Sequence, residues 1–518
     1  MIKLLSLALV VLTAFSVVGC GGCDWSMFDA LFEIQPEVPS GEWNSPDDTT
    51  LVTGDKKETN APDYAPSFIG TVPYSKIDFD GTEVVVLLPD TKEAAQSWYK
   101  ESPETVLDEF VEMRNSAVIE AINAEILVEF VPGADFASKK ANILSMVAQD
   151  VASDIHYYDV VSAPVDMLVD TALRDFLAGV NNEDCFPYFE FALDCWNQTL
   201  VTECKVNGRL YFMSGATEVS NMLDASVIWH NKTLYDAKKE STDHESMAGL
   251  VRDGRWTYDE LYKWATVLYE DSNGVPGQQA DDTYGLGIEG DGKYPYADAF
   301  RSAWNVRFAG EKITEGVGLN GLSANDNRAL NALEMVKALY GAGGTYVNAN
   351  ANEFVAGRYL FYLGTFDSLK DAPNGEDTFE LLPMPKYNSD QSEYRTFVED
   401  PMVTAIIDHE ESTRPTEGDA TSAVLQLTAE ESYMGVFGNF GEYVPLEMNS
   451  ENNKIIKQIF ENMQLTFENI YAPQLAGLDT LWGDALISDA DLSNAYSENE
   501  KTYKDAIDDI NRWFALVE

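Results

Sequence analysis

The chain has 518 residues, and its 87 acidic residues against 34 basic ones give a formal net charge of −53 at pH 7. Such a field repels nucleic acid and anionic membrane surfaces, so neither is expected to bind the folded surface. The 45% hydrophobic and 12% aromatic content suffices for large buried cores, and the length suggests two to four domains.

The first twenty residues have the pattern of a bacterial export signal. Lys3 gives a positive start, and the apolar run over residues 4–18 is shorter than the about 20 residues of a membrane-spanning helix. The run ends in Val17-Val18-Gly19-Cys20, which resembles a lipobox, and this implies cleavage before Cys20 and a lipid on its sulfur. We therefore predict a signal peptide over residues 1–19 and a lipoprotein on the outer face of the plasma membrane, extracellular or periplasmic. An ordinary secretory signal with an incidental cysteine is the alternative.

A stretch rich in Pro, Gly, Ser, Thr and Asp follows the signal. It covers residues 20–75 and has no sustained periodicity, so it predicts a flexible stalk. Further along, Cys185, Cys195 and Cys204 lie close together without the spacing or nearby histidine of a zinc site. One local disulfide, such as Cys195–Cys204, and three free thiols both stay open.

Strand and helix patterns alternate at the start of the globular part. The apolar run over 83–88 predicts a buried parallel strand, and strands over 126–131 and 159–162 follow at regular intervals. Helices are predicted between them, from about residue 103 and over 136–148. This β-α-β-α-β order predicts an open parallel sheet with a ligand beyond the carboxyl ends of its strands.

The stretch from Lys205 to Asp236 predicts a crossing between two lobes. An Asn207-Gly208 turn precedes an inter-lobe strand that ends at Met213, and the polar segment 214–224 should skirt a cleft. A second strand over 225–230 then starts the next lobe. The flexible points of this hinge are expected at Gly208, Ser214 and Gly215.

Further elements are predicted along the rest of the chain. Thr257 and Glu260 have the spacing of a capping box at a helix start. After Pro401 the chain reads as mostly helical, with a final amphipathic helix over about 503–516. Strands are expected over 284–288, in the second half of 354–363 and over 379–383, and helices over 297–308 and 325–340.

Several motifs resemble, in order and spacing, those of extracellular solute-binding proteins of ABC importers, in the sugar-binding group that includes maltose-binding protein. They are Asn207-Gly208-x-x-Tyr211, the segment 227–234, Trp256-Thr257-Tyr258-Asp259-Glu260-Leu261, the segment 354–366 and Leu382-Pro383-Met384-Pro385. The resemblance implies an α/β, two-lobed periplasmic-binding-protein-like fold of type II, with discontinuous lobes, a hinge and a cleft. We expect lobe 1 over 80–210 and 352–400, and lobe 2 over 215–350 and 405–518.

The same resemblance implies a receptor and not an enzyme. It would be a monomer without cofactor or metal, which closes around a mono- or oligosaccharide and delivers it to an ABC permease. Sugar recognition uses flat aromatic faces and planar hydrogen-bonding groups. The residues expected to bind the sugar are Asp90, Asp166, Tyr211, Tyr294, Tyr296, Phe366, Asp367 and Trp482. A helix N-cap is the alternative for Asp90 and Asp166, and a place in the core is the alternative for the rings.

Two other functions stay open. The same fold could bind a peptide, a polyamine or a metal chelate, and a cleft rich in acids and poor in aromatics would favour a cation. A surface glycoside hydrolase is the remote alternative, because no acid pair stands out among the 87 acids and no nucleophile motif is present. Asp489-x-Asp491-x-Ser493 faintly resembles an EF-hand calcium loop, but Asn494 stands where that loop needs glycine, and an acidic helix start explains the run better.

Overall fold

The computed structural model describes most of the globular part of the chain. The described residues are 50–51, 70–71, 74–100, 102–153, 156–239, 245–272, 274–309, 327–372, 376–409, 415–436, 440–444, 446 and 450–515. The predicted signal peptide, Cys20 and most of the predicted stalk lie outside them. Within these ranges no helix is both long and apolar enough to cross a membrane.

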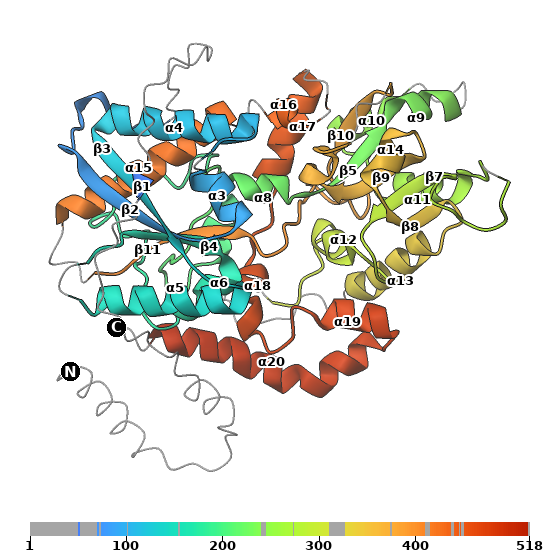
Figure 1. Ribbon diagram of the computed structural model, residues 1–518. Coiled ribbons are helices and arrows are strands. Elements are labelled where there is room, and N and C mark those ends of the chain that lie inside the picture. Colours follow the sequence, from blue (N-terminus) through green and yellow to red (C-terminus); the bar gives the residue numbers. More distant parts are fainter. Residues whose placement is uncertain are drawn as a thin grey trace. The chain divides into compact units, whose positions relative to one another are not determined.

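The first sheet has five strands in the order β1-β3-β2-β4-β11 (Figure 1). The central strand β2 runs parallel to both β3 and β4, and its Val86 pairs with Val128 on one side and Val160 on the other. The edge strands β1 and β11 are antiparallel. The bounds are β1 Thr50–Leu51, β2 Thr82–Pro89, β3 Ala124–Val131, β4 Val160–Pro164 and β11 Met402–Ile406. The predicted β-α-β-α-β order is thus confirmed.

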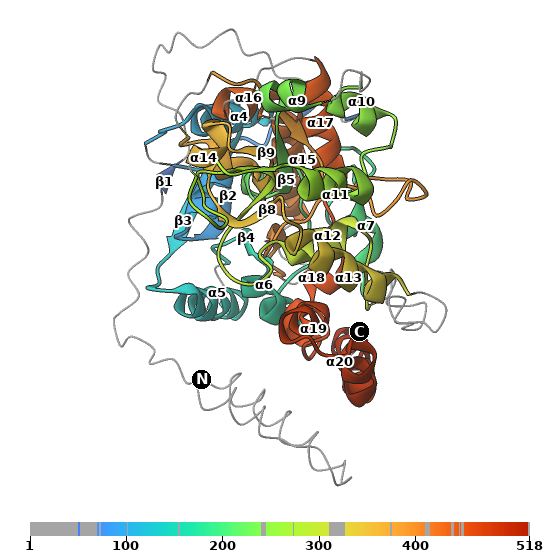
Figure 2. The same cartoon turned by 90° about the vertical axis from the view of Figure 1, so that its right-hand side faces the viewer.

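Helices cover both faces of the first sheet. Helices α4 and α15 lie on one face and α5 and α6 on the other (Figures 1 and 2), which explains why almost all of β2 is apolar and buried. Thr105 starts α4 and Asp135 starts α5 with reciprocal capping boxes. The helices around this sheet are α3 Lys92–Trp98, α4 Val106–Ile122, α5 Phe136–Val151, α6 Val165–Ala172 and α15 Pro415–Glu431.

The second sheet has the order β10-β5-β9-β7-β6, with β8 beside β7. Strand β7 is parallel to β8 and β9, whereas β5 is antiparallel to both of its neighbours. The bounds are β5 Ser226–Asn231, β6 Tyr269–Glu270, β7 Thr283–Glu289, β8 Thr345–Ala349, β9 Tyr359–Thr365 and β10 Phe379–Leu382. The helices are α9 Lys232–Lys238, α10 Met247–Arg252, α11 Tyr258–Val267, α12 Ala297–Ala303, α13 Arg328–Tyr340 and α14 Ala351–Val355. Thr257 precedes α11 but its side chain makes no capping hydrogen bond, so that predicted box is wrong.

Two of the predicted lobe boundaries are wrong. Residues 352–400 were expected in lobe 1, but β9 and β10 bond to β5 and β7 of the second sheet. Residues 405–518 were expected in lobe 2, but β11 extends the first sheet and α15 packs on β2 and α4. The apolar run of β9 is buried along six of its seven residues because it lies between β5 and β7. Its sequence fits a central strand of either sheet, and only the non-local partner decides which.

The C-terminal helices contact elements of both lobes. Helix α17 packs on β10 and α19 on α13, whereas α18 packs on α6. The final amphipathic helix is confirmed as α20, which packs on α19. The bounds are α17 Ser450–Glu461, α18 Phe467–Ile470, α19 Leu481–Ser488 and α20 Leu492–Ala515.

Hydrogen bonds hold together the two chain segments that link the sheets, residues 214–225 and 383–401, and each bond joins one segment to the first residue of the strand that follows the other. The backbone N–H of Ser226 donates to the carbonyl of Phe397 at 2.9 Å. The side chain of Asn221 bonds to both backbone groups of Met402, at 2.9 Å to the carbonyl and 2.8 Å from the N–H. Residues 205–213 do not form the predicted inter-lobe strand. They contain only isolated bridges, in which Val206 pairs with Arg209 and Met213 pairs with Thr404.

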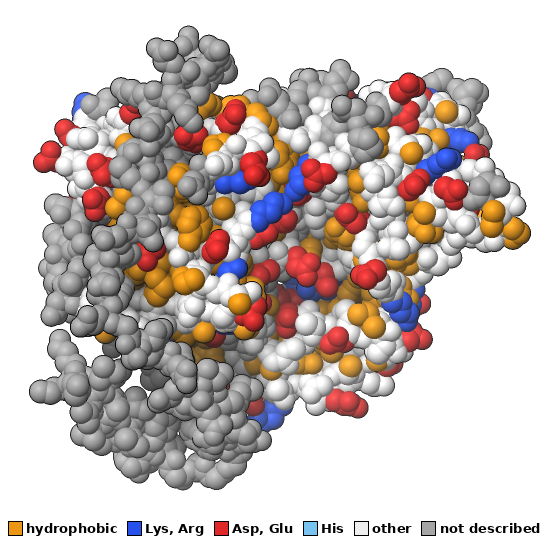
Figure 3. All heavy atoms as spheres, in the orientation of Figure 1, with side chains coloured by type: hydrophobic (Ala, Val, Ile, Leu, Met, Phe, Trp, Pro, Cys, Tyr) orange, Lys and Arg blue, Asp and Glu red, His pale blue; other side chains and the backbone are white. Residues whose placement is uncertain are grey.

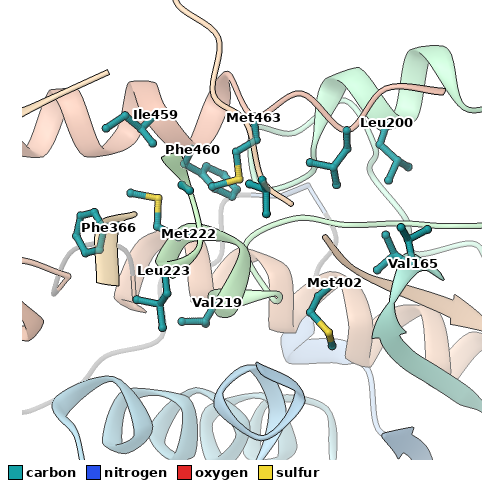
Figure 4. Close-up of a cluster of buried hydrophobic side chains, with 14 of the residues drawn as sticks. Val165, Leu200, Val219, Met222, Leu223, Phe366, Met402, Ile459, Phe460 and Met463 are labelled. Carbon is teal, nitrogen blue, oxygen red and sulfur yellow. The ribbon is translucent and has the colours of Figure 1, made fainter. Parts of the chain in front are cut away.

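The first linking segment is buried along most of its length. Its short helix α8, Val219–Leu223, places Val219, Met222 and Leu223 in an apolar cluster that also contains Phe366 (Figure 4). Only Asp224 at its end is exposed. Most of the segment expected to skirt the cleft is therefore core, and Asp224 is the residue that reaches solvent.

The predicted hinge residues have very different surroundings. Ser214 and Gly215 are buried, and Ser214 donates to the carbonyl of Met402 at 3.1 Å. Gly208 lies in an exposed turn with a φ of +82°, between the bridge partners Val206 and Arg209. Local backbone freedom is therefore present at Gly208, whereas packing restricts the other two positions.

The cysteines and the described parts of the stalk are also defined. Cys195 and Cys204 are free thiols, so the Cys195–Cys204 disulfide is not formed, and burial raises the pKa of both thiols. Cys185 accepts a hydrogen bond from the side chain of Asn182 at 3.1 Å. Within the range predicted as a flexible stalk, β1 pairs with β3. Gly70 donates to Glu430 at 2.8 Å, so this part of the stalk is bound to the folded body.

Candidate functional site

A cavity of about 520 Å³ lies at one edge of the second sheet. It opens where the parallel strands β7 and β9 end and β5 begins, next to the Ser226–Thr365 pair. Ligands of open α/β sheets bind at this edge, beyond the carboxyl ends of the strands. The lining residues are Asp224, Ser226, Tyr294, Pro295, Tyr296, Ala297, Asp298, Thr365, Phe397 and Glu399. Both linking segments and the loop before α12 therefore contribute to one site.

Tyrosine rings form the aromatic part of the cavity wall. Tyr296 has a left-handed backbone with a φ of 60°, and its hydroxyl donates to Glu289 Oε2 at 3.3 Å. The same Glu289 oxygen accepts a hydrogen bond from Ser368, so the ends of β7 and β9 hold this ring together. Tyr294 packs edge-on against Tyr340 with 5.3 Å between ring centroids. Both rings are half-buried and keep a face toward the cavity.

Carboxylates form the polar part of the wall. Surrounding protein raises the pKa of Asp224 to about 6 although its side chain stays exposed, and the nearby carboxylates of Glu93 and Asp367 add to the effect. Glu399 is exposed on the second linking segment, whereas Asp298 accepts a hydrogen bond from Arg301 at 2.8 Å. Figure 3 shows acidic side chains gathered around the hollowed centre of the face drawn.

Two further acidic residues, Asp400 and Asp166, lie between this wall and the first lobe. Asp400 Oδ1 accepts the backbone N–H of Asp166 at 3.3 Å, at the start of α6. Desolvation by surrounding protein raises the pKa of Asp400 to about 7, and repulsion by the Asp166 carboxylate contributes. Burial likewise raises the pKa of Asp166. The predicted site residue Asp166 therefore lies beside Asp400, which directly follows Glu399 of the cavity wall.

The other predicted acids lie outside the cavity lining. Asp90 is exposed in the bend directly after β2. Asp367 accepts a hydrogen bond from Tyr443 at 2.7 Å and forms ion pairs with Lys92, at 3.4 Å, and with Lys370. Its carboxylate is thus already neutralised by two ammonium groups.

Three of the predicted aromatic residues are buried in the core. Tyr211 stacks on Phe514 at 4.6 Å between centroids, and Trp482 donates its indole N–H to the carbonyl of Ala329 at 3.1 Å. Phe366 packs in the cluster of Figure 4. Their exposed fractions are 1%, 0% and 0% for Tyr211, Phe366 and Trp482. In this structure they present no face to the cavity.

Several cavity residues were missed in the sequence. Ser226 lies at the start of the strand predicted over 225–230, Thr365 follows a predicted strand, and Phe397 and Glu399 come shortly before the return strand β11. Their one sequence signal is position, since each lies where the chain enters or leaves a strand at the edge of the second sheet. That signal requires the strand order, which the sequence does not reveal.

The residues around the calcium-like motif have other partners. Asp489 pairs with Lys337 at 2.5 Å, and Asp491 accepts the backbone N–H of Asn494 at 2.9 Å at the start of α20. Among the described residues, no group of three or more His, Cys, Asp or Glu side chains is arranged to hold a metal ion. The helix-start interpretation of this acidic run fits these contacts.

The structure is similar to that of the sugar-binding protein MalE from the phytopathogen Xanthomonas citri. The TM-score is 0.51 at 15% sequence identity, and the match covers 84% of this chain and 100% of that chain. Weaker likenesses include UgpB from Mycobacterium tuberculosis in complex with glycerophosphocholine, at a TM-score of 0.47 and 14% identity over 83% of this chain and 98% of that one. MalE from Bdellovibrio bacteriovorus bound to maltotriose gives 0.45 and 12%, over 83% and 100%.

These likenesses concern the fold. The chain has an α/β periplasmic-binding-protein-like fold similar to that of MalE, as predicted, and this fold is built on two mixed sheets. No protein-family model matches the sequence, and a comparison with curated proteins finds no match either.

Proposed function

We propose that this protein is the solute-binding receptor of an ABC importer and that it captures a carbohydrate. The observation that carries the proposal is the cavity of about 520 Å³ at the carboxyl edge of the second sheet, lined by Tyr294 and Tyr296. Its volume lies within the roughly 300–1,000 Å³ of small-molecule sites. Tyrosine faces suit the C–H surfaces of a pyranose ring, and carboxylate and hydroxyl oxygens accept hydrogen bonds from sugar hydroxyls.

In this proposal the protein performs no chemistry. The signal over residues 1–19 exports the chain, a lipid on Cys20 holds it at the outer face of the membrane, and the lobes close around the sugar. The closed form then delivers its ligand to a permease. The fold, which is that of MalE, supports this reading. A surface glycoside hydrolase predicts turnover of chromogenic glycosides, which the receptor would not show.

The ring of Tyr296 should contribute strongly to affinity. We expect Tyr296→Ala to weaken binding of a sugar at least tenfold, because the substitution removes the ring that Glu289 holds at the cavity wall. The measurement is titration calorimetry with a panel of mono- and oligosaccharides on the mature protein. Tyr262→Ala is the matched control, since Tyr262 lies on α11 and not in the cavity wall. Equal affinity of the wild type and Tyr296→Ala would contradict the placement of the sugar at this cavity.

A non-sugar solute is the second candidate, because three of the ten lining residues are carboxylates. This acidic lining favours a cationic ligand. Binding of peptides or polyamines without binding of any sugar in the same panel would support this candidate against the first.

A further inference from the structure

The charged residues of the cavity wall are all acidic. Its lining residues include Asp224, Asp298 and Glu399 but no lysine or arginine. Asp298 is paired with Arg301. Asp224 and Glu399 have no hydrogen-bond or ion-pair partner for their carboxylates in the described part of the chain. Among the described residues, these two carboxylates of the site therefore form no ion pair.

The lysines that act electrostatically on Asp224, Lys92 and Lys370, form ion pairs with another residue. Lys92 and Lys370 form their ion pairs with Asp367, and Lys140 pairs with Asp170 at 2.9 Å. A neutral sugar that displaced water from this wall could donate hydroxyl hydrogen bonds to Asp224 and Glu399, but it would leave their negative charge uncompensated. Desolvating a carboxylate whose charge is not compensated is costly, so a neutral ligand binds against this penalty.

The aromatic residues of the wall suit a cation as well. Tyr294, Tyr296 and Phe397 all line the cavity, and the negative face of an aromatic ring attracts an ammonium group. The chain already uses one of these rings in this way, since Lys293 Nζ lies 5.2 Å from the centroid of Tyr294. This wall therefore combines two kinds of group that bind an ammonium ion, aromatic rings and carboxylates without an ion-pair partner.

From this wall we infer that the ligand is a carbohydrate that carries at least one protonated amine, such as an amino sugar or its short oligomer. The sugar ring lies against the tyrosines, and the ammonium group binds at Asp224 and Glu399. The inference rests on the proposed function and narrows its substrate class. Polyamines share the ammonium chemistry without the sugar ring, so the experiment separates these two sources.

The test compares matched ligands by titration calorimetry at pH 7.5. The ligands are a trimer of glucosamine, its N-acetylated counterpart, a neutral glucose trimer and spermidine. We expect the glucosamine trimer to bind at least tenfold more tightly than the other three. Asp224→Asn and Glu399→Gln should each weaken binding of the glucosamine trimer much more than binding of the neutral trimer and thereby remove most of this preference. Asp259→Asn is the control, because Asp259 is exposed on α11 away from the cavity wall.

A pH series adds an independent readout. Protonation of Asp224 should weaken binding of the glucosamine trimer several-fold between pH 7.5 and pH 5, since the pKa of this carboxyl is about 6. The charged groups that act on it are Glu93 and Lys92 of α3 and Asp367 and Lys370 beside β9. The amines of the ligand take up protons as the pH falls, which alone would strengthen binding, so a loss of affinity reports on the protein. The Asp224→Asn variant should not show this loss.

The outcomes separate the inference from the proposed function. Neutral or N-acetylated trimers that bind as tightly as the glucosamine trimer would overturn the inference and leave the carbohydrate receptor standing. Spermidine binding without any sugar binding would overturn both in favour of the polyamine alternative. Unchanged preference in both carboxylate variants would move the ammonium site away from Asp224 and Glu399. Binding of none of the four ligands would count against the proposed function itself.

Discussion

Replacing Glu218 with glutamine should stabilise the protein at pH 8 by about 3 kcal/mol and flatten the pH dependence of its stability. Glu218 is 1% exposed in the first linking segment. Burial raises its pKa from 4.5 to about 7, although Thr404 and the backbone of Gly215 donate hydrogen bonds to the carboxylate at 2.6 and 2.8 Å. Each pKa unit corresponds to about 1.4 kcal/mol between the two protonation states, which gives the expected magnitude.

The direction of the pH dependence follows from the raised pKa. The folded state binds this proton more tightly than the unfolded state, so the wild type should gain stability as the pH falls from about 8 to about 5. Glutamine keeps the shape and stays neutral, and the hydroxyl of Thr404 can accept from its amide as it does from a protonated carboxyl. The measurement is urea unfolding at several pH values, with the exposed Glu498→Gln as the control. A loss of stability in Glu218→Gln at pH 8 would mean that the carboxylate is ionised and stabilised in the fold, with Arg114 as the nearby cation.

Individual strands could be predicted from the sequence better than the strands with which they pair. The apolar runs of β2 and β5 predicted strands directly, because each is long, β-branched and bounded by turn residues. The assignment of β9 and β10 to the first lobe was wrong, because pairing depends on strands far away in the sequence. The return strand β11 was read as part of a helical region, since its five residues are too few to show a period.

The same limit applies to the residues of the candidate site. Tyr294 and Tyr296 line the cavity and follow β7 at its carboxyl end, and they were predicted as site residues from the resemblance to sugar-binding receptors. Phe366 also follows a strand, β9, yet it is buried against α8. An aromatic residue that follows a strand can therefore lie either in the cavity wall or in the core. An element from elsewhere in the chain decides which, because α8 covers Phe366 whereas Tyr294 and Tyr296 stay open to the cavity.

Replacing Gly215 with alanine should destabilise the fold by roughly 3 kcal/mol or more, because a Cβ at this position would lie 2.2 Å from the carbonyl oxygen of Cys195. That oxygen accepts the N–H of Ala216 at 2.8 Å, so it cannot move away without breaking this hydrogen bond. Proline would also remove the N–H that donates to Glu218. Glycine is thus required here for close packing of the linking segment, whereas the sequence suggested a flexible point of the hinge.

Gly208→Ala is the matched comparison, since a Cβ there meets no atom within 4 Å and the cost comes only from the φ of +82°. That cost should be about 1 kcal/mol. Urea unfolding together with the sugar affinity of the folded fraction separates packing from hinge motion. A packing role predicts that Gly215→Ala unfolds at much lower urea than Gly208→Ala and that its folded fraction binds sugar with unchanged affinity. If Gly215→Ala were as stable as the wild type but bound sugar more weakly, residue 215 would be the hinge after all, and lobe closure would bend within the buried network around Asn221.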